Sequence, residues 1–165
     1  WSAELPEALR TRLLRVGILL FGCTLVQIVI GSQVREALAH VAETLSLPRA
    51  QWIDEVGWLD HVHRSFSWVI LLSGVYIAWV VLRQETPLLL RKLCLGTLAL
   101  MLAQIVFGIV LVYGGMPWPM QLLHTGTSAM LVCAECLLLL QLRSVQKSSL
   151  VVTSTRPTNN PAFSP

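Results

Sequence analysis

Residues 61–82, HVHRSFSWVILLSGVYIAWVVL, place two histidines and an arginine directly before an apolar run. From residue 65 to residue 82 the run contains no charged side chain and is apolar nearly all round. Such a pattern is typical of a helix that contacts lipid, since a helix at the surface of a soluble protein keeps a polar face. The length is close to the ~20 residues that a spanning helix needs. The stretch therefore predicts a membrane-spanning helix with titratable nitrogens at one end.

Three other segments have the same character, and they cover residues 16–34, 93–113 and 120–142. Of the four, only the last contains an acid, Glu135. The whole chain is 55% hydrophobic and 13% charged, with a mean hydropathy of +0.67, which excludes an ordinary soluble globular protein. We expect an all-α fold, an integral membrane four-helix bundle with lipid as its solvent.

The basic residues predict the orientation of this bundle. Nine of them flank the segments on one side: Arg10, Arg12, Arg15, Arg83, Arg91, Lys92, Arg143, Lys147 and Arg156. The other side, formed by residues 35–64 and a short GGMPWP turn, holds three arginines and five acids. The positive-inside rule then puts both termini in the cytoplasm and residues 35–64 outside the cell membrane. The net charge of +3 thus reflects the excess of basic residues on the cytoplasmic side and gives no reason to expect nucleic acid.

The chain divides into three parts by composition. Residues 1–15 are an amphipathic polar lead-in, which we expect to be cytoplasmic and to continue a longer protein. Residues 16–142 form the bundle, with its outer loop at 35–64. Residues 143–165 are rich in Ser, Thr, Pro and Asn, and we expect most of them to form a disordered cytoplasmic tail.

A short phrase repeats in the first and third spans. It reads QIVIG at residues 27–31 and QIVFG at residues 104–108. Each copy is followed by an outer loop and then by a helix with a histidine at its outer end, His63 in the first case and His124 in the second. The bundle is therefore expected to consist of two repeated helical hairpins.

His63 and His124 occupy corresponding ends of the second and fourth spans, so they can converge across the bundle. Two facing imidazoles with room between them make a bis-histidine haem site, in which both are axial ligands of the iron. Small side chains recur below both histidines, at Ser67, Gly74, Thr127 and Ser128. Small residues also mediate plain helix packing in membranes, and interfacial histidines can simply meet water, so this alternative stays open. We expect His61 and His40 to be solvated.

Other polar side chains have both a functional and an ordinary interpretation. Arg64 and Arg35 lie where haem propionates would emerge, but both can equally extend into water from a helix end. Glu135 is predicted to be protonated, to bond with Ser73, Thr97 or a neighbouring subunit, or to belong to a proton route from the cytoplasmic side. We expect the four cysteines to be small apolar filler: Cys23, Cys94, Cys133 and Cys136.

Three stretches resemble heme A synthase, a family of cytochrome oxidase assembly proteins: QIVIGSQVRE at 27–36, HVHRSFSWVILL at 61–72 and QIVFGIVLVYGGMPWPMQLLHTGTSAML at 104–131. The resemblance covers about residues 13–142. It implies an architecture of eight spans in two four-helix halves, each with a histidine pair. This chain resembles one half, and more closely the C-terminal half that holds haem b, because GSQVRE follows the first span and the outer loop lacks paired cysteines.

The resemblance implies a reaction, the oxidation of a methyl group of heme O to a formyl group, which gives heme A. Haem b would be the cofactor, with His63 and His124 as its iron ligands and Arg64 and Arg35 near its propionates. The family's essential glutamate corresponds in position to Asp60, and Glu55 and Glu36 are further candidates for a catalytic acid. Implied partners are membrane lipid, a heme O synthase, a reductant, and either further copies of the chain or a missing N-terminal half.

Two other classes of function remain. The same helices can form a b-type membrane cytochrome that passes electrons between quinol and an outer acceptor, without a reaction of its own. A structural assembly factor without haem is the third interpretation, and it leaves His63 and His124 unexplained.

Overall fold

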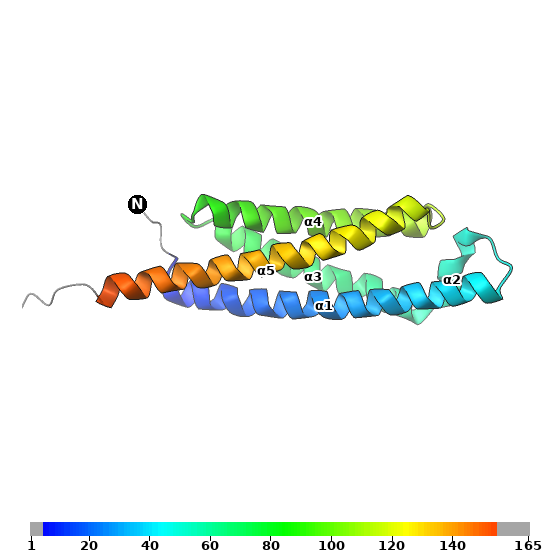
Figure 1. Cartoon of the computed structure of the whole chain (residues 1–165), viewed down its shortest axis with the longest axis horizontal. Coiled ribbons are helices and arrows are strands. Elements are labelled where there is room, and N and C mark those ends of the chain that lie inside the picture. Colours follow the sequence, from blue (N-terminus) through cyan, green and yellow to red (C-terminus); the bar gives the residue numbers. More distant parts are fainter. Residues whose placement is uncertain (1–4, 155–165) are drawn as a thin grey trace, which may run out of the picture.

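The computed structural model describes the backbone of residues 5–154 and the side chains of residues 5–144. Four long helices lie along one common axis: α1 (Glu7–Thr44), α3 (Trp58–Leu82), α4 (Leu88–Tyr113) and α5 (Trp118–Ser154) (Figure 1). A 3₁₀ turn, η1 (Arg49–Gln51), and a short helix, α2 (Trp52–Val56), connect α1 to α3. The described part of the chain contains no strand, so the predicted all-α fold is confirmed.

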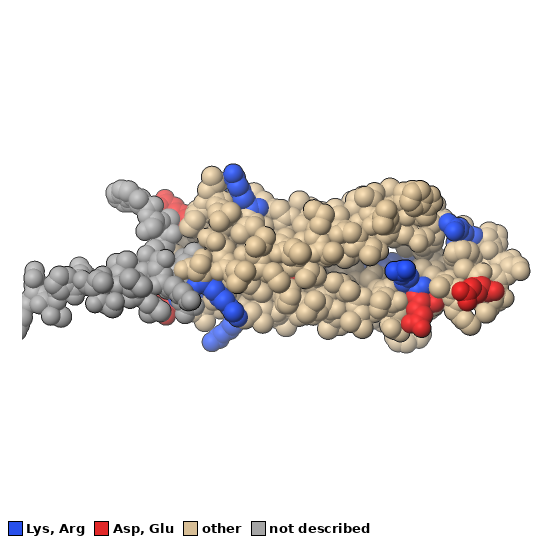
Figure 2. Space-filling model, viewed as in Figure 1, with Lys and Arg blue, Asp and Glu red and all other residues tan. Residues whose placement is uncertain are grey.

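The surface of the bundle is apolar along its length. Each long helix contains a segment long and apolar enough to cross a membrane, which confirms the four predicted spans. Large apolar side chains point outward between the two ends, among them Leu19, Leu72 and Leu122, each about two-thirds exposed at 66%, 64% and 67%. Figure 2 shows charged atoms at the two ends of the bundle and none across the middle of this face. The chain is therefore a multi-pass membrane protein, whose outer surface is apolar because it contacts lipid.

The helices occupy the corners of a square. Both α1 and α4 pack against α3 and α5, whereas α3 and α5 lie diagonally opposite each other. Apolar side chains from all four helices fill the centre, including Leu20, Ile77, Leu90 and Leu138. Gly74 of α3 makes room for the sulfur of Met101, which a Cβ at residue 74 would displace. This arrangement puts the two histidine-bearing helices across the core from each other.

Two helices are longer than the spans that the sequence predicts. Helix α1 begins at Glu7, so most of the polar lead-in is part of the same helix as the first span, and it continues to Thr44. Residues 35–44 contain good helix formers and neither Gly nor Pro, and the helix stops shortly before Pro48. Helix α5 likewise runs past residue 142 to Ser154 instead of ending where the polar tail begins. Residues 155–165, the rest of the predicted tail, lie outside the described residues.

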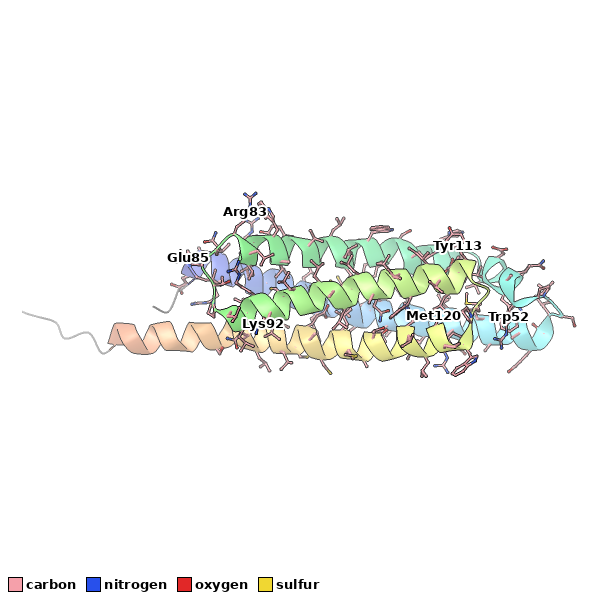
Figure 3. All side chains as sticks on the ribbon, turned by 90° about the horizontal axis from the view of Figure 1, so that it is seen from above. Trp52, Arg83, Glu85, Lys92, Tyr113 and Met120 are labelled. Atoms are coloured by element: carbon pink, nitrogen blue, oxygen red, sulfur yellow. The ribbon has the colours of Figure 1, made fainter. Side chains whose placement is uncertain are left out.

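One end of the bundle, which we call the loop end, carries both hairpin connections. Figure 3 shows Trp52, Tyr113 and Met120 at this end and Arg83, Glu85 and Lys92 at the other. The indole nitrogen of Trp52 donates a hydrogen bond to the Leu47 carbonyl oxygen at 3.0 Å, and this contact folds the loop back on itself. A Cβ at Gly115 would lie 3.9 Å from the Cβ of Ala50. The long first loop therefore lies against the short second turn at this end of the bundle.

Candidate functional site

His63 and His124 lie at the loop end, in the second turns of α3 and α5. Because these helices are diagonally opposite, the two imidazoles face the bundle from opposite corners, and they are close enough for an electrostatic interaction between them. Both side chains are half-buried. The structure thus brings together the two histidines that the sequence singles out, although they are 61 positions apart.

Each histidine is braced by the glutamine of the repeated phrase. The Nε2 atom of Gln27 donates hydrogen bonds to the His63 carbonyl oxygen at 2.9 Å and to the Ser67 hydroxyl at 2.7 Å. In the second hairpin, Gln104 Nε2 donates to the His124 carbonyl oxygen at 2.8 Å and to the Thr127 hydroxyl at 2.8 Å. The glutamine therefore ties the neighbouring helix at the same turn in both hairpins.

The glycine of each phrase lies against the imidazole ring. A Cβ at Gly31 would come 3.0 Å from His63 Cε1, which is closer than a side chain tolerates without movement of the ring. A Cβ at Gly108 would lie 3.8 Å from His124 Cε1, at ordinary van der Waals distance. The Gln-x-x-x-Gly phrase thus has a structural meaning, since the glutamine fixes the backbone of the histidine while the glycine four residues later admits its ring.

The nitrogen atoms of the two rings differ in environment. Nδ1 of His63 and Nδ1 of His124 are buried without a hydrogen-bond partner, whereas neither Nε2 is buried in this way. Nε2 is therefore the nitrogen of each ring that we consider as an iron ligand. Among the described residues no group of three or more His, Cys, Asp and Glu side chains could hold a bare metal ion. Two imidazoles are a sufficient protein donor set when a macrocycle supplies the other iron ligands, so the residues present fit a haem.

The predicted acids and arginines are arranged differently from the histidines. Asp60 is buried, and its carboxylate pairs with the Arg64 guanidinium at 2.6 Å, one turn apart on α3. Arg64 also contacts His61 Nδ1 at 3.2 Å. The Arg64 guanidinium thus contacts two side chains of its own helix, Asp60 and His61. The remaining candidates, Arg35, Glu36 and Glu55, are exposed at the loop end and have no ion pair within the described part of the chain.

Glu135 has a partner that the sequence did not suggest. Thr24 of α1 donates a hydrogen bond from its hydroxyl to Glu135 Oε1 at 2.8 Å. The predicted partners Ser73 and Thr97 instead donate to the carbonyl oxygens of Val69 and Leu93 on their own helices. Thr24 precedes Gln27 by three residues and therefore lies on the same face of α1, a spacing that could have identified it.

The four cysteines, predicted to be small apolar filler, are free thiols, and two of them lie outside the core. Cys94 is buried and Cys23 is half-buried, whereas Cys133 and Cys136 are exposed. The exposed pair lies three residues apart on the outer, lipid-facing side of α5, because the opposite side of that helix carries Leu131, Glu135 and Leu138 into the core.

Comparison with known proteins is consistent with these features. The family model described as cytochrome oxidase assembly protein (COX15-CtaA) matches residues 2–136, which include the first three spans, most of the fourth and both histidines. No curated protein and no solved structure matches the chain. The match confirms the resemblance to heme A synthase that the three sequence stretches carry. The chain therefore belongs to the COX15-CtaA family of cytochrome oxidase assembly proteins.

Proposed function

We propose that this bundle holds a haem between His63 and His124, which act as axial iron ligands through Nε2, and that it serves heme A synthesis for cytochrome oxidase. The observation that carries the proposal is the duplicated arrangement at the loop end. In each hairpin a glutamine, Gln27 or Gln104, donates to the carbonyl oxygen of the histidine, and a glycine, Gly31 or Gly108, lies against its ring. The two histidines belong to diagonally opposite helices. Two equivalent ligands on repeated hairpins suit a flat, nearly symmetric macrocycle.

The protein's own contribution is to bind and orient the group and to limit its contact with water. A bound haem supplies electron transfer at its iron. The glutamines hold the backbone of each histidine, and the glycines let the rings lie close to α1 and α4. The long loop lies against the turn at Gly115, at the same end of the bundle as both histidines. The hydrogen bonds of Gln27 and Gln104 act in an apolar interior, where each is difficult to replace.

For the reaction, we propose that the chain takes part in oxidation of the heme O methyl group to the formyl group of heme A, with haem b in the histidine pocket. Membership in an assembly family for cytochrome oxidase supports this role. Asp60 is the candidate catalytic acid nearest to the histidines in sequence, and Glu55 and Glu36 are the alternatives. Heme O synthase, a reductant and a second bundle, either another copy or another half, are the partners that this reaction would require.

A second function, a b-type cytochrome that only carries electrons, is favoured by one observation. Asp60 is tied to Arg64 at 2.6 Å and buried, so this acid is engaged in an ion pair. If the acids of this bundle only form ion pairs, the bundle would hold a haem and pass electrons to a separate site at which heme O is oxidised. The Asp60→Asn variant separates the two functions. If the chain oxidises heme O, the variant should bind haem fully but form no heme A. If the chain only carries electrons, the variant should still transfer them.

We also propose that the loop end faces outward from the cell membrane and that both termini are cytoplasmic. The excess of Lys and Arg at the opposite end and the acids of the long loop support this orientation. The haem pocket then lies toward the outer side.

The decisive experiment is a visible spectrum of the purified protein together with identification of the extracted haem. We expect a reduced b-type spectrum that is lost in His63→Ala and in His124→Ala. His61→Ala is the matched control, since His61 lies two residues from His63 but is exposed and should leave the spectrum unchanged. A colourless, folded wild-type protein after haem-replete expression would refute the proposal. Heme O or heme A in the extract would show that this bundle binds the substrate or the product, and haem b would show that it binds the cofactor.

A further inference from the structure

Glu135 is a buried acid in the middle of α5 whose hydrogen bonding is incomplete. Its side chain is 2% exposed. Oε1 accepts the Thr24 hydrogen bond, whereas Oε2 is buried and has no partner. No charged side chain among the described residues interacts with it. A carboxylate without a cation is costly inside a membrane bundle, so the group is expected to be a neutral carboxylic acid with one O–H to donate.

Polar groups lead from Glu135 toward the histidines. Thr24 and Gln27 are one turn apart on the same face of α1, about 4.5 Å along the helix axis. Gln27 in turn contacts the His63 carbonyl oxygen and the Ser67 hydroxyl. Between residue 20 and residue 27 of α1, the inward-facing side chains therefore change from apolar Leu20 to this polar series.

The same region contains further buried polar atoms without partners. Besides Glu135 Oε2, they are Gln27 Oε1, His63 Nδ1 and His124 Nδ1, and they come from three helices. Buried polar groups in native proteins are almost always satisfied by protein or by ordered water. Ordered water is the usual partner of such atoms when the protein supplies none.

A small cavity lies on the other side of Glu135, one turn nearer the end opposite the loops. It is lined by all four helices, and its polar lining comes from Cys94 and Thr97. Its volume of about 10 Å³ is about the space of one water molecule. The titratable groups in this stretch of the bundle, other than Glu135, are the phenol of Tyr76 and four thiols. The Tyr76 ring lies 5.6 Å from the Arg12 guanidinium, and the thiols belong to Cys23, Cys94, Cys133 and Cys136.

We propose that Glu135 is the inner end of a proton path, which connects the middle of the membrane to the histidine pocket through Thr24, Gln27 and bound water. The proton leaves Glu135 Oε2 for water and is replaced by a proton from water, without any transfer of electrons. The purpose of the path rests on the proposed function: the positive charge of an oxidised haem in the pocket would favour the ionised form of Glu135, and loss of that charge on reduction would let the carboxylate take up one proton from water through the path.

The first test is infrared spectroscopy of the protein in D₂O, which does not need bound haem. We expect a carboxylic acid C=O band that disappears in Glu135→Gln and remains in Glu43→Gln, a matched control because Glu43 is exposed on α1. The band should shift within minutes of transfer to D₂O, and Thr24→Val should move it by removing the hydrogen bond to Oε1. Absence of the band, or a band that stays unshifted for hours, would overturn the proposal.

The direction of exchange is tested by two further variants. Gln27→Leu should slow the D₂O shift at least tenfold, whereas Thr97→Val, which removes a hydroxyl from the cavity on the other side, should leave its rate unchanged. If Thr97→Val slowed the exchange and Gln27→Leu did not, the proton would exchange with the end opposite the loops. That result would overturn the proposed path from Glu135 to the histidine pocket.

A third measurement links the path to the haem. In the reduced-minus-oxidised infrared spectrum, the Glu135 band should change, and the pH dependence of the midpoint potential should become weaker in Glu135→Gln. Haem-bound protein with no such band and an unchanged pH dependence would refute the path while leaving the proposed function intact. Protein that binds no haem would refute the proposed function, and the D₂O exchange would still decide whether Glu135 holds an exchangeable proton.

Discussion

The side-chain amide of Gln27 donates a hydrogen bond to the backbone carbonyl oxygen of His63 at 2.9 Å, from one helix of the first hairpin to the other. Ser67 also donates to that carbonyl oxygen, at 3.0 Å, and the Ser67 oxygen accepts a bond from Gln27. The His63 turn is therefore fixed to α1 by a small closed network. The second hairpin repeats it with Gln104, His124 and Ser128.

Loss of the Gln27 hydrogen bond should leave His63 in place but make the orientation of its ring less well defined. We expect Gln27→Leu to reduce stability by roughly 0.5–1.5 kcal/mol, the usual net worth of a hydrogen bond. Haem should still bind, but the haem electron paramagnetic resonance signal should broaden as the His63 ring becomes less well oriented. Gln33→Leu, at an exposed site on the same helix, is the control and should change neither property. An unaltered signal in Gln27→Leu would mean that the brace does not orient the ring.

The two glycines of the repeated phrase should differ in their tolerance of a methyl group. Gly31→Ala puts a Cβ 3.0 Å from His63 Cε1, so we expect the ring to move and haem content to fall. Gly108→Ala puts its Cβ 3.8 Å from His124 Cε1 and should bind haem nearly as well as the wild type. Gly22→Ala has nothing within 4 Å and serves as the control. Equal haem content in the Gly31 and Gly108 variants would contradict the close packing at His63.

Gly74 should be required for packing in the middle of the bundle. An alanine there meets the sulfur of Met101, the far end of a flexible side chain that must move aside, and we expect a loss of about 1 kcal/mol, the low end of the cost of overpacking. Thermal unfolding in detergent measures it. Gly96→Ala, in open space on α4, should be neutral or slightly stabilising, because alanine favours a helix over glycine. A smaller loss from Gly74→Ala in a Met101→Ala background than in the wild type would identify the contact as the cause.

The proposed orientation can be tested by cysteine labelling. In a background in which the native cysteines are replaced by serine or alanine, Glu43→Cys should react with a membrane-impermeant maleimide added to intact cells. Gln84→Cys, in the connection between α3 and α4, should react only after the membrane is opened. Both positions are exposed, so their reactivity reports the side of the membrane and not burial. The opposite labelling pattern would reverse the orientation.

The ion pair between Asp60 and Arg64 should matter little for stability. Arg64 is 42% exposed, so solvent screens the pair, and we expect Asp60→Asn to cost less than about 1 kcal/mol. A complete loss of heme A formation in a variant with wild-type stability and haem content would assign Asp60 to catalysis. Retention of heme A formation would exclude this acid and direct attention to Glu55 and Glu36.

Local composition and periodicity were enough to determine the four spans, the all-α class and the equivalence of the two hairpins. Long apolar segments have few alternatives in a membrane, because every backbone group must be paired within a helix. The repeated Gln-x-x-x-Gly phrase and the histidine after each outer loop likewise identified the candidate ligands. The helix ends were predicted less well: the sequence contains no break at residues 15, 34 or 142, and polarity alone does not end a helix.

The tertiary structure decided which polar side chains meet. Thr24 and Glu135 are 111 positions apart, and the pairing of α1 with α5 that joins them is set by packing of the whole bundle. The choice of Arg64 as the partner of Asp60 and the exposure of Cys133 and Cys136 depend on how each helix is rotated about its axis. In a helix that is apolar on nearly every side, the sequence carries little information about that rotation, so only contacts between the helices fix it.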